Sequence, residues 1–172
     1  MYRFLYDNLE HFSQWLKTTG PHYFVVHNAW VVPACQTLHF FGLAMLFGMV
    51  GLLDLRMLGV ARSLPIGPIN RVAPPWGFAG FILNTITGFL LYAGDPVQYF
   101  HNVAFRWKML FVLLAGLNLS AFLLTGMSKK VDTIGPGEDA PVLAKFIAAT
   151  SLFLWIGVMY WGRMLPFIGS AF

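Results

Sequence analysis

Residues 30–53 decide the fold class. They read WVVPACQTLHFFGLAMLFGMVGLL and contain no Asp, Glu, Lys or Arg. A helix rises about 1.5 Å per residue, so roughly 20 apolar residues cross the hydrocarbon core of a bilayer. Pro33 falls in the first turn, where its missing N–H does little harm. The stretch therefore predicts a membrane-spanning helix.

The composition of the whole chain agrees with this stretch. The 172 residues are 58% hydrophobic and 17% aromatic, but only 10% are charged. A soluble domain carries about 25% charged residues. The mean hydropathy is +0.66, so the main solvent of the chain is expected to be lipid. About four or five crossings would use the length and leave no room for a separate soluble catalytic domain.

Three further apolar segments resemble the first in length. We expect spans at about residues 76–93, 105–125 and 144–165. The prolines at 74–75 open the second span and the GDP triplet at 94–96 closes it. The polar stretch KKVDTIGPGEDAP, at 129–141, is rich in turn residues. Residues 29–172 therefore predict an all-α, integral membrane four-helix bundle.

Residues 1–28 are expected to form an interfacial helix and a linker. Apolar residues recur at helical spacing at Tyr2, Leu5, Leu9, Phe12 and Leu16. This pattern is typical of an amphipathic helix that lies in the membrane interface. The TTGP segment ends the helix, and the residues after it link to the first span. The N-terminus lacks an apolar h-region and a cleavage-like pair, so no signal peptide is expected.

The basic residues indicate topology rather than nucleic-acid binding. The net charge is +4, but no basic run is long enough to follow a phosphate backbone. The loops after the first and third spans hold Arg56, Arg62, Arg71, Lys129, Lys130 and Lys145. The other side holds Arg3, Lys17, Arg106, Lys108 and Arg163. The small excess predicts a multi-pass protein of the bacterial inner membrane with both termini periplasmic.

Each predicted span carries polar side chains at a similar depth. His39 and Asn84 lie about nine residues from the outer ends of their spans, roughly 14 Å in, and two more polar residues lie somewhat deeper. Gln36 lies one turn above His39 on the same face. The resulting buried polar layer comprises Gln36, His39, Asn84, Thr87, Asn118 and Ser151.

Two interpretations of the layer stay open. Polar side chains commonly join membrane helices by hydrogen bonds, so the layer can simply hold the bundle together. Ionisable groups within membranes are also functional candidates, so His39 can ligate haem b or contact a quinone. No other histidine lies in a predicted span, so a haem would be five-coordinate or shared with a partner chain. A proton path would need further titratable groups in the layer, and none is present.

The remaining charges are predicted to act at the membrane interfaces. At the inner interface we expect Asp54 to reach a basic residue in another loop and Arg56 to meet lipid phosphate. At the outer interface we expect snorkelling and loop pinning by Asp95, Arg106, Lys108 and Arg163. His22, His27 and His101 are irregularly spaced, and Cys35 is the single cysteine, so no metal site is predicted.

Four segments resemble a known family. They are WVVPACQTLHFFGLAMLFGMVGLLDLRMLG, TGFLLYAGDP, NVAFRWKMLFVLLAGLN and SLFLWIGVMYWGRML. Over about residues 29–165 they resemble the small bacterial four-span membrane proteins of the DUF6644 type. The most specific parts are the Leu38-His39 pair, the closure from Asp54 to Arg56, and residues 155–163. The resemblance implies a four-helix inner-membrane bundle and supplies no established activity.

No phosphate loop, nucleophile elbow or matched pair of buried carboxylates occurs in the sequence. We therefore expect a non-catalytic membrane subunit that anchors or supports a larger respiratory or photosynthetic complex. Its expected partners are the lipid bilayer and other membrane subunits, not nucleic acid. One alternative is a membrane electron-transfer protein that uses His39. The other is a small transporter or proton channel.

Overall fold

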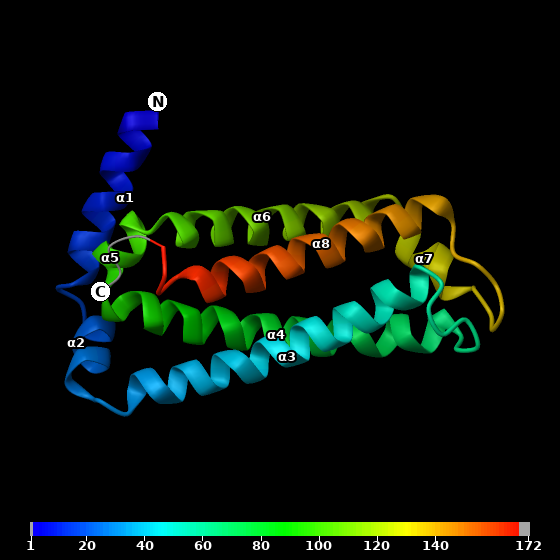
Figure 1. The fold of residues 1–172 in the computed structure, drawn as a ribbon, viewed down its shortest axis with the longest axis horizontal. Coiled ribbons are helices and arrows are strands. Elements are labelled where there is room, and N and C mark those ends of the chain that lie inside the picture. Colours follow the sequence, from blue (N-terminus) through cyan, green and yellow to red (C-terminus); the bar gives the residue numbers. More distant parts are fainter. Residues whose placement is uncertain (1, 169–172) are drawn as a thin grey trace.

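A computed structural model describes residues 2–168, with side chains from Asn8 onward. This part of the chain is all-helical, and four of its helices are long and apolar enough to cross a membrane (Figure 1). The predicted fold class is therefore confirmed. In chain order the helices are α1 (Tyr2–Leu16), α2 (Gly20–His27), α3 (Val31–Met57), α4 (Ile66–Gly94), α5 (Pro96–His101), α6 (Val103–Leu124), α7 (Met127–Asp132) and α8 (Val142–Met164).

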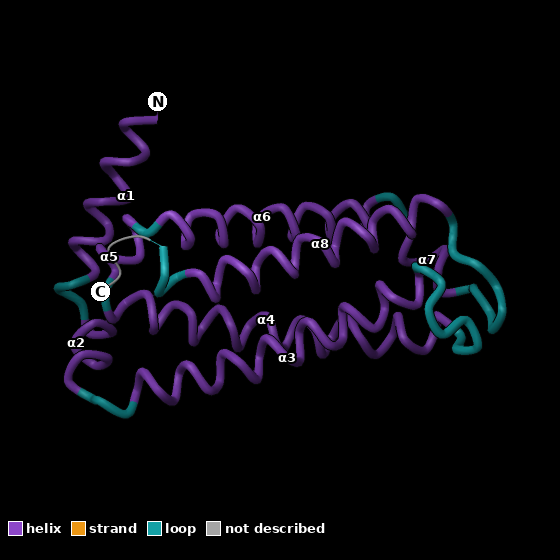
Figure 2. Tube along the Cα trace, in the orientation of Figure 1, coloured by secondary structure: helices purple, strands orange, loops and turns teal. Residues whose placement is uncertain are grey.

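The four long helices form two pairs that lie side by side. Helix α3 packs mainly on α4, α6 packs mainly on α8, and the pairs meet through α3 and α8. The loops around α7 gather at one end of the bundle, on the right of Figure 2, and we call it the α7 end. Helices α2 and α5 lie at the opposite end, which we call the α2 end.

Two glycines set the close crossing of α3 and α4. A Cβ atom added to Gly80 would lie 2.7 Å from the carbonyl oxygen of Gly42 and 2.8 Å from the backbone nitrogen of Leu46. No side chain fits at that distance, so the two backbones approach only because residue 80 is glycine. A Cβ atom on Gly48, by contrast, would meet nothing within 4 Å.

Buried apolar side chains concentrate at the two ends of the bundle. At the α2 end, Val25 of α2 packs with Val31 and Cys35 of α3. A larger cluster at the α7 end joins α3, α4, α6, α7 and α8. It comprises Leu53, Met57, Ile66, Ala73, Phe122, Met127, Val131, Ile134, Ala140, Ala144, Ile147 and Ala148.

Helix α4 begins earlier than predicted. We expected the prolines at 74–75 to precede the span, but both lie inside α4, which starts at Ile66. Contacts with α7 hold this extra part in place: Ile66 is fully buried, and Asn70 donates to the carbonyl of Ser128 at 3.1 Å. Proline fixes φ near the helical value, so packing outweighs the loss of two backbone donors.

Two short helices replace segments that we expected to be irregular. The segment after Pro21, predicted as a linker, forms α2 and covers the end of α4. The polar stretch at 129–141 contains the end of α7, which begins after Gly126 in the left-handed conformation, at φ +71°. Both helices bury apolar residues against the bundle, and the sequence pattern alone did not reveal this packing.

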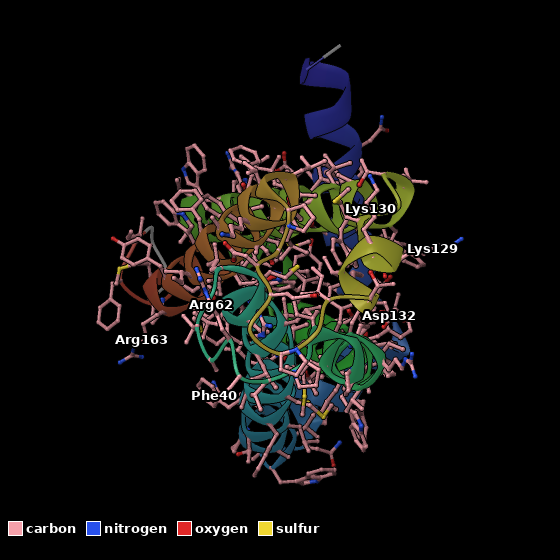
Figure 3. All side chains as sticks on the ribbon, turned by 90° about the vertical axis from the view of Figure 1, so that its right-hand side faces the viewer. Phe40, Arg62, Lys129, Lys130, Asp132 and Arg163 are labelled. Atoms are coloured by element: carbon pink, nitrogen blue, oxygen red, sulfur yellow. The ribbon has the colours of Figure 1, made fainter. Side chains whose placement is uncertain are left out.

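Helix α1 runs crosswise to the long axis of the bundle in both Figure 1 and Figure 3. Ser13 and Leu16 are buried, and the Ser13 and Tyr92 hydroxyls lie 2.8 Å apart. Leu9, Phe12 and Trp15 are exposed. This orientation and this apolar surface suit a helix that lies in the membrane interface.

Candidate functional site

The geometry around His39 fixes its tautomer. His39 Nδ1 lies 2.9 Å from the Thr87 hydroxyl, and that hydroxyl lies 2.7 Å from the carbonyl oxygen of Leu83. A carbonyl only accepts, so Thr87 gives its proton to Leu83 and accepts from His39 Nδ1–H. In the neutral imidazole the Nε2 lone pair is then free to accept a proton or ligate a metal. The ring is half-buried against α4, where a Cβ atom on Gly88 would lie 3.3 Å from His39 Cε1.

The other helix pair carries a lysine that lies beside α8. Lys108 of α6 is half-buried, and its Nζ would lie 3.7 Å from a Cβ atom on Gly162 of α8. No hydrogen bond or ion pair to Lys108 occurs among the described residues. The side chain of Lys108 thus packs beside α8.

The other members of the predicted polar layer make separate contacts. Asn118 Nδ2 donates to the carbonyl of Ile147 at 3.0 Å and so joins α6 to α8. Asn84 lies against Gly42, and its buried Oδ1 has no hydrogen-bond partner in the described part of the chain. Ser151 of α8 lies beside Asp54 of α3. The described side chains therefore form pairwise contacts rather than one shared network.

Gln36 faces a cavity at the α2 end. The cavity has a volume of about 340 Å³, and Asp95 and Tyr99 also line it. Gln36 is exposed, so the cavity wall reaches the surface of the bundle. His39 follows one turn later on α3, on the same face.

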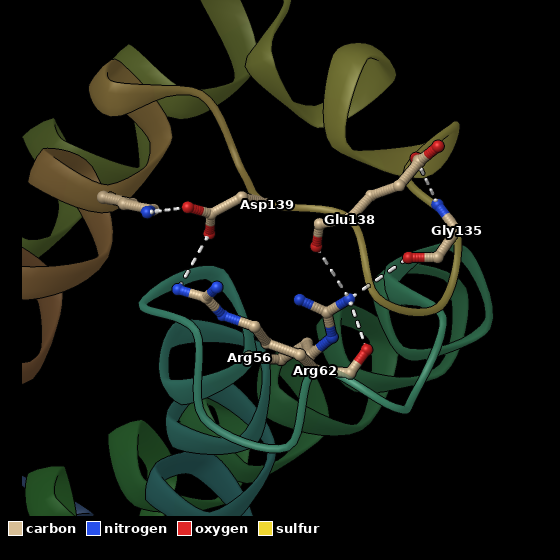
Figure 4. A network of polar contacts seen from close by, with 6 residues as sticks. Arg56, Arg62, Gly135, Glu138 and Asp139 are labelled. Carbon is tan, nitrogen blue, oxygen red and sulfur yellow. Dashed lines mark hydrogen bonds and ion pairs between the residues drawn. The ribbon is translucent and has the colours of Figure 1, made fainter.

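Arg56 does not face lipid phosphate, as we had expected. Its side chain is 1% exposed, and its guanidinium donates to backbone carbonyls from two loops (Figure 4). Nε donates to Leu64 at 2.5 Å, and Nη2 donates at 3.2–3.4 Å to Arg62, Gly135 and Glu138. Arg56 therefore ties the loop after α3 to the loop before α8.

Asp54 also differs from the expectation. It is 4% exposed and makes no ion pair with a basic residue in the described chain. Its Oδ2 is buried without a hydrogen-bond partner. Because residues two apart on a helix point in different directions, Asp54 faces α8 while Arg56 faces the loops.

The charges at the α2 end have individual contacts. The Asp95 carboxylate accepts from the backbone N–H of Gln98 at 3.3 Å and caps α5. Arg106 donates to the carbonyl of Phe100 at 3.1 Å. Arg163, which points outward in Figure 3, lies over the ring of Phe167 at 5.5 Å.

The three outer histidines bond to separate backbone carbonyls, those of Ala93, Tyr23 and Val97, at 2.8–2.9 Å. These are His22, His27 and His101. Among the described residues no group of three or more His, Cys, Asp and Glu side chains could hold a metal ion.

Sequence reasoning did not find the ion pairs at the α7 end. Asp139 lies 2.5 Å from Lys145 Nζ and 3.6 Å from Arg62 (Figure 4). The hydrogen bond from Lys145 lowers the pKa of the Asp139 carboxyl below its ordinary value, and the charges of Arg62 and Lys145 add to this. Arg62 and Asp139 lie far apart in the sequence, so the loop conformation that pairs them leaves no local pattern.

The fold and these sites are those of a multi-pass helical membrane protein. Its four long helices are apolar enough to lie in lipid, and polar side chains lie inside its bundle. Within that class, the chain belongs to the family of unknown function DUF6644, whose model matches residues 12–168. This confirms the resemblance seen in the sequence. Neither the curated proteins nor the solved structures contain a match to the chain.

Proposed function

We propose that this protein is a non-catalytic membrane subunit that anchors or supports a larger respiratory or photosynthetic complex. The observation that favours this role is the position of α1. The helix leaves the bundle crosswise, is attached mainly through α5, and exposes Leu9, Phe12 and Trp15. Four helices already embed the chain in lipid, so a further apolar helix at the interface is available to a neighbouring subunit.

We also propose a location and an orientation for the chain, on the basis of its loop charges. We place the chain in a bacterial inner membrane, with the α7 end in the cytoplasm and the α2 end in the periplasm. The α7 end carries Arg56, Arg62, Arg71 and the two lysines of α7. Short cytoplasmic loops carry an excess of Lys and Arg.

A triple variant of α1 tests the anchoring role. Leu9→Ser, Phe12→Ser and Trp15→Ser together remove the exposed apolar surface of α1 but leave all four spanning helices intact. We expect the variant to reach the membrane and to lose the proteins that co-purify with the wild type. The control is Phe40→Ala, because Phe40 projects outward from α3 and is 70% exposed (Figure 3). Unchanged co-purification in the triple variant would contradict the role given to α1.

A second candidate function is electron transfer through His39. The free Nε2 favours it, because a ligating histidine usually donates its other ring N–H to an acceptor. The four spanning helices contain no second histidine, so a haem with two imidazole ligands would take one from a partner subunit. A quinol could instead donate its hydroxyl to Nε2.

The visible spectrum separates these possibilities. If His39 ligates haem, protein from haem-replete native membranes shows a Soret band that His39→Ala removes. If His39 contacts quinol, no such band occurs, and bound quinone is extracted from wild type but not from His39→Ala. A protein that carries neither group counts against electron transfer and leaves the anchoring proposal intact.

A further inference from the structure

The cavity at the α2 end has the features of a small-molecule site. It is open to the surface, and residues of α2, the start of α3, the end of α4 and the beginning of α5 line it. Its apolar wall includes Val25, Val32 and Leu91, and its volume is about 340 Å³. Ligand sites in proteins commonly measure about 300–1,000 Å³ and combine apolar walls with a few polar groups.

The polar groups of the cavity leave a negative charge uncompensated. Asp95 uses one oxygen to cap α5 and makes no ion pair with any described residue. The amide of Gln36 makes no hydrogen bond within the described part of the chain. Burial raises the pKa of the Tyr99 phenol, and the Asp95 carboxylate raises it further. Tyr99 therefore keeps its proton and adds no charge of its own.

We propose that this cavity binds an amphiphile with a cationic amine head and an apolar tail. The Asp95 carboxylate neutralises the ammonium, and the carbonyl oxygen of the Gln36 side chain accepts one of its N–H groups. The side chain of Tyr99, on the wall of the same cavity, packs against the head group. Val32 is exposed on the wall of the cavity, so the tail can continue from there into lipid.

Other ligand classes fit less well. An anionic head would be repelled by Asp95, because a carboxylate in a partly apolar site is only weakly screened. A bare metal ion needs several ligands, and the described residues hold no group of three or more ligating side chains. The inference depends on the cavity alone and not on the proposed function.

Binding of two amphiphiles with the same tail tests this proposal. Dodecylamine and dodecanoate are titrated by calorimetry into the full chain in zwitterionic nanodiscs, and partitioning into empty nanodiscs is subtracted. We expect saturable binding of the amine and none of the carboxylate. Asp95→Asn should weaken amine binding about tenfold, the effect of losing one hydrogen bond to a charged group. Asparagine caps a helix as well as aspartate does, so α5 is retained.

A cavity-filling pair provides the control. Val32→Trp places a large ring in the cavity and should abolish amine binding. Val72→Trp places the same ring near the α7 end, outside the cavity, and should leave binding unchanged. Equal binding of amine and carboxylate, or equal affinities of wild type and Asp95→Asn, would overturn the proposal.

Discussion

At the scale of single residues, Arg56 joins the two loops of the α7 end. Four backbone carbonyls accept from it, and its side chain is almost fully buried. We expect Arg56→Met to lower the free energy of unfolding by about 3 kcal/mol or more, because buried carbonyls lose a charged donor. Thermal unfolding in detergent measures this. The exposed Arg163→Met is the control, and an equal effect in both variants would contradict the role of Arg56.

The close approach of α3 and α4 at Gly80 can be tested by substitution. Gly80→Ala forces a Cβ atom against the backbone of α3, so we expect a loss of about 1–3 kcal/mol, the usual cost of overpacking. Gly48→Ala adds the same methyl group where nothing lies within 4 Å and should be close to neutral. Unfolding curves of the two variants should therefore separate clearly. Coincident curves would mean that α3 and α4 do not cross at Gly80.

The interactions of Asp139 should make the stability of the fold depend on pH. Its pKa in the folded chain lies below the ordinary value of 3.8, chiefly because Lys145 donates to it. A lowered carboxyl pKa stabilises the fold above the ordinary pKa, and the stabilisation is lost as the pH falls through the folded value. Asp139→Asn should therefore be less stable than wild type at pH 7, and the difference should shrink toward zero below pH 3.8. A difference that stays constant from pH 7 to pH 3 would contradict this.

Some residue roles were predictable from the sequence and others were not. The depths of His39 and Asn84 follow from counting along their helices, but the rotation of each helix decides which polar groups meet. Thr87 rather than Asn84 is the partner of His39. The cage around Arg56 consists of backbone carbonyls from distant loops, and no sequence pattern marks carbonyl groups.

At the scale of elements, α1 is attached to the bundle by a small number of contacts. The Ser13 hydroxyl donates to the carbonyl of Leu9, so it accepts from Tyr92. Tyr92→Phe removes this donor, and a net loss of about 1 kcal/mol should speed hydrogen exchange in residues 8–16 roughly fivefold. The control is Tyr160→Phe on the exposed face of α8. Unchanged exchange in Tyr92→Phe would mean that other contacts hold α1.

Most spanning helices could be predicted from the sequence, but the start of α4 could not. The spanning parts of α3, α6 and α8 were predicted because continuous apolar runs identify them. The start of α4 was missed because two prolines usually mark a helix boundary, while here burial of Ile66 and Gly67 against α7 keeps the helix continuous. Such tertiary contacts are not visible in a local pattern.

At the scale of the whole molecule, the proposed topology predicts which side of the membrane gives reagents access to each end of the bundle. In a Cys35→Ala background, a cysteine placed at the exposed Thr133 at the α7 end should react only with reagents that reach the cytoplasm. A cysteine at Val103, also exposed but at the α2 end, should react with an impermeant reagent added outside. The opposite pattern would reverse the orientation.

We propose that this membrane bundle works as a subunit of a larger assembly. The most direct measurement is the size of the particle that carries the tagged chain after extraction from native membranes in a mild detergent, read by native electrophoresis and mass spectrometry. We expect the 19.3 kDa chain to migrate in a much larger particle with the same partner proteins in each preparation. Migration as a single stable chain without partners would contradict the claim.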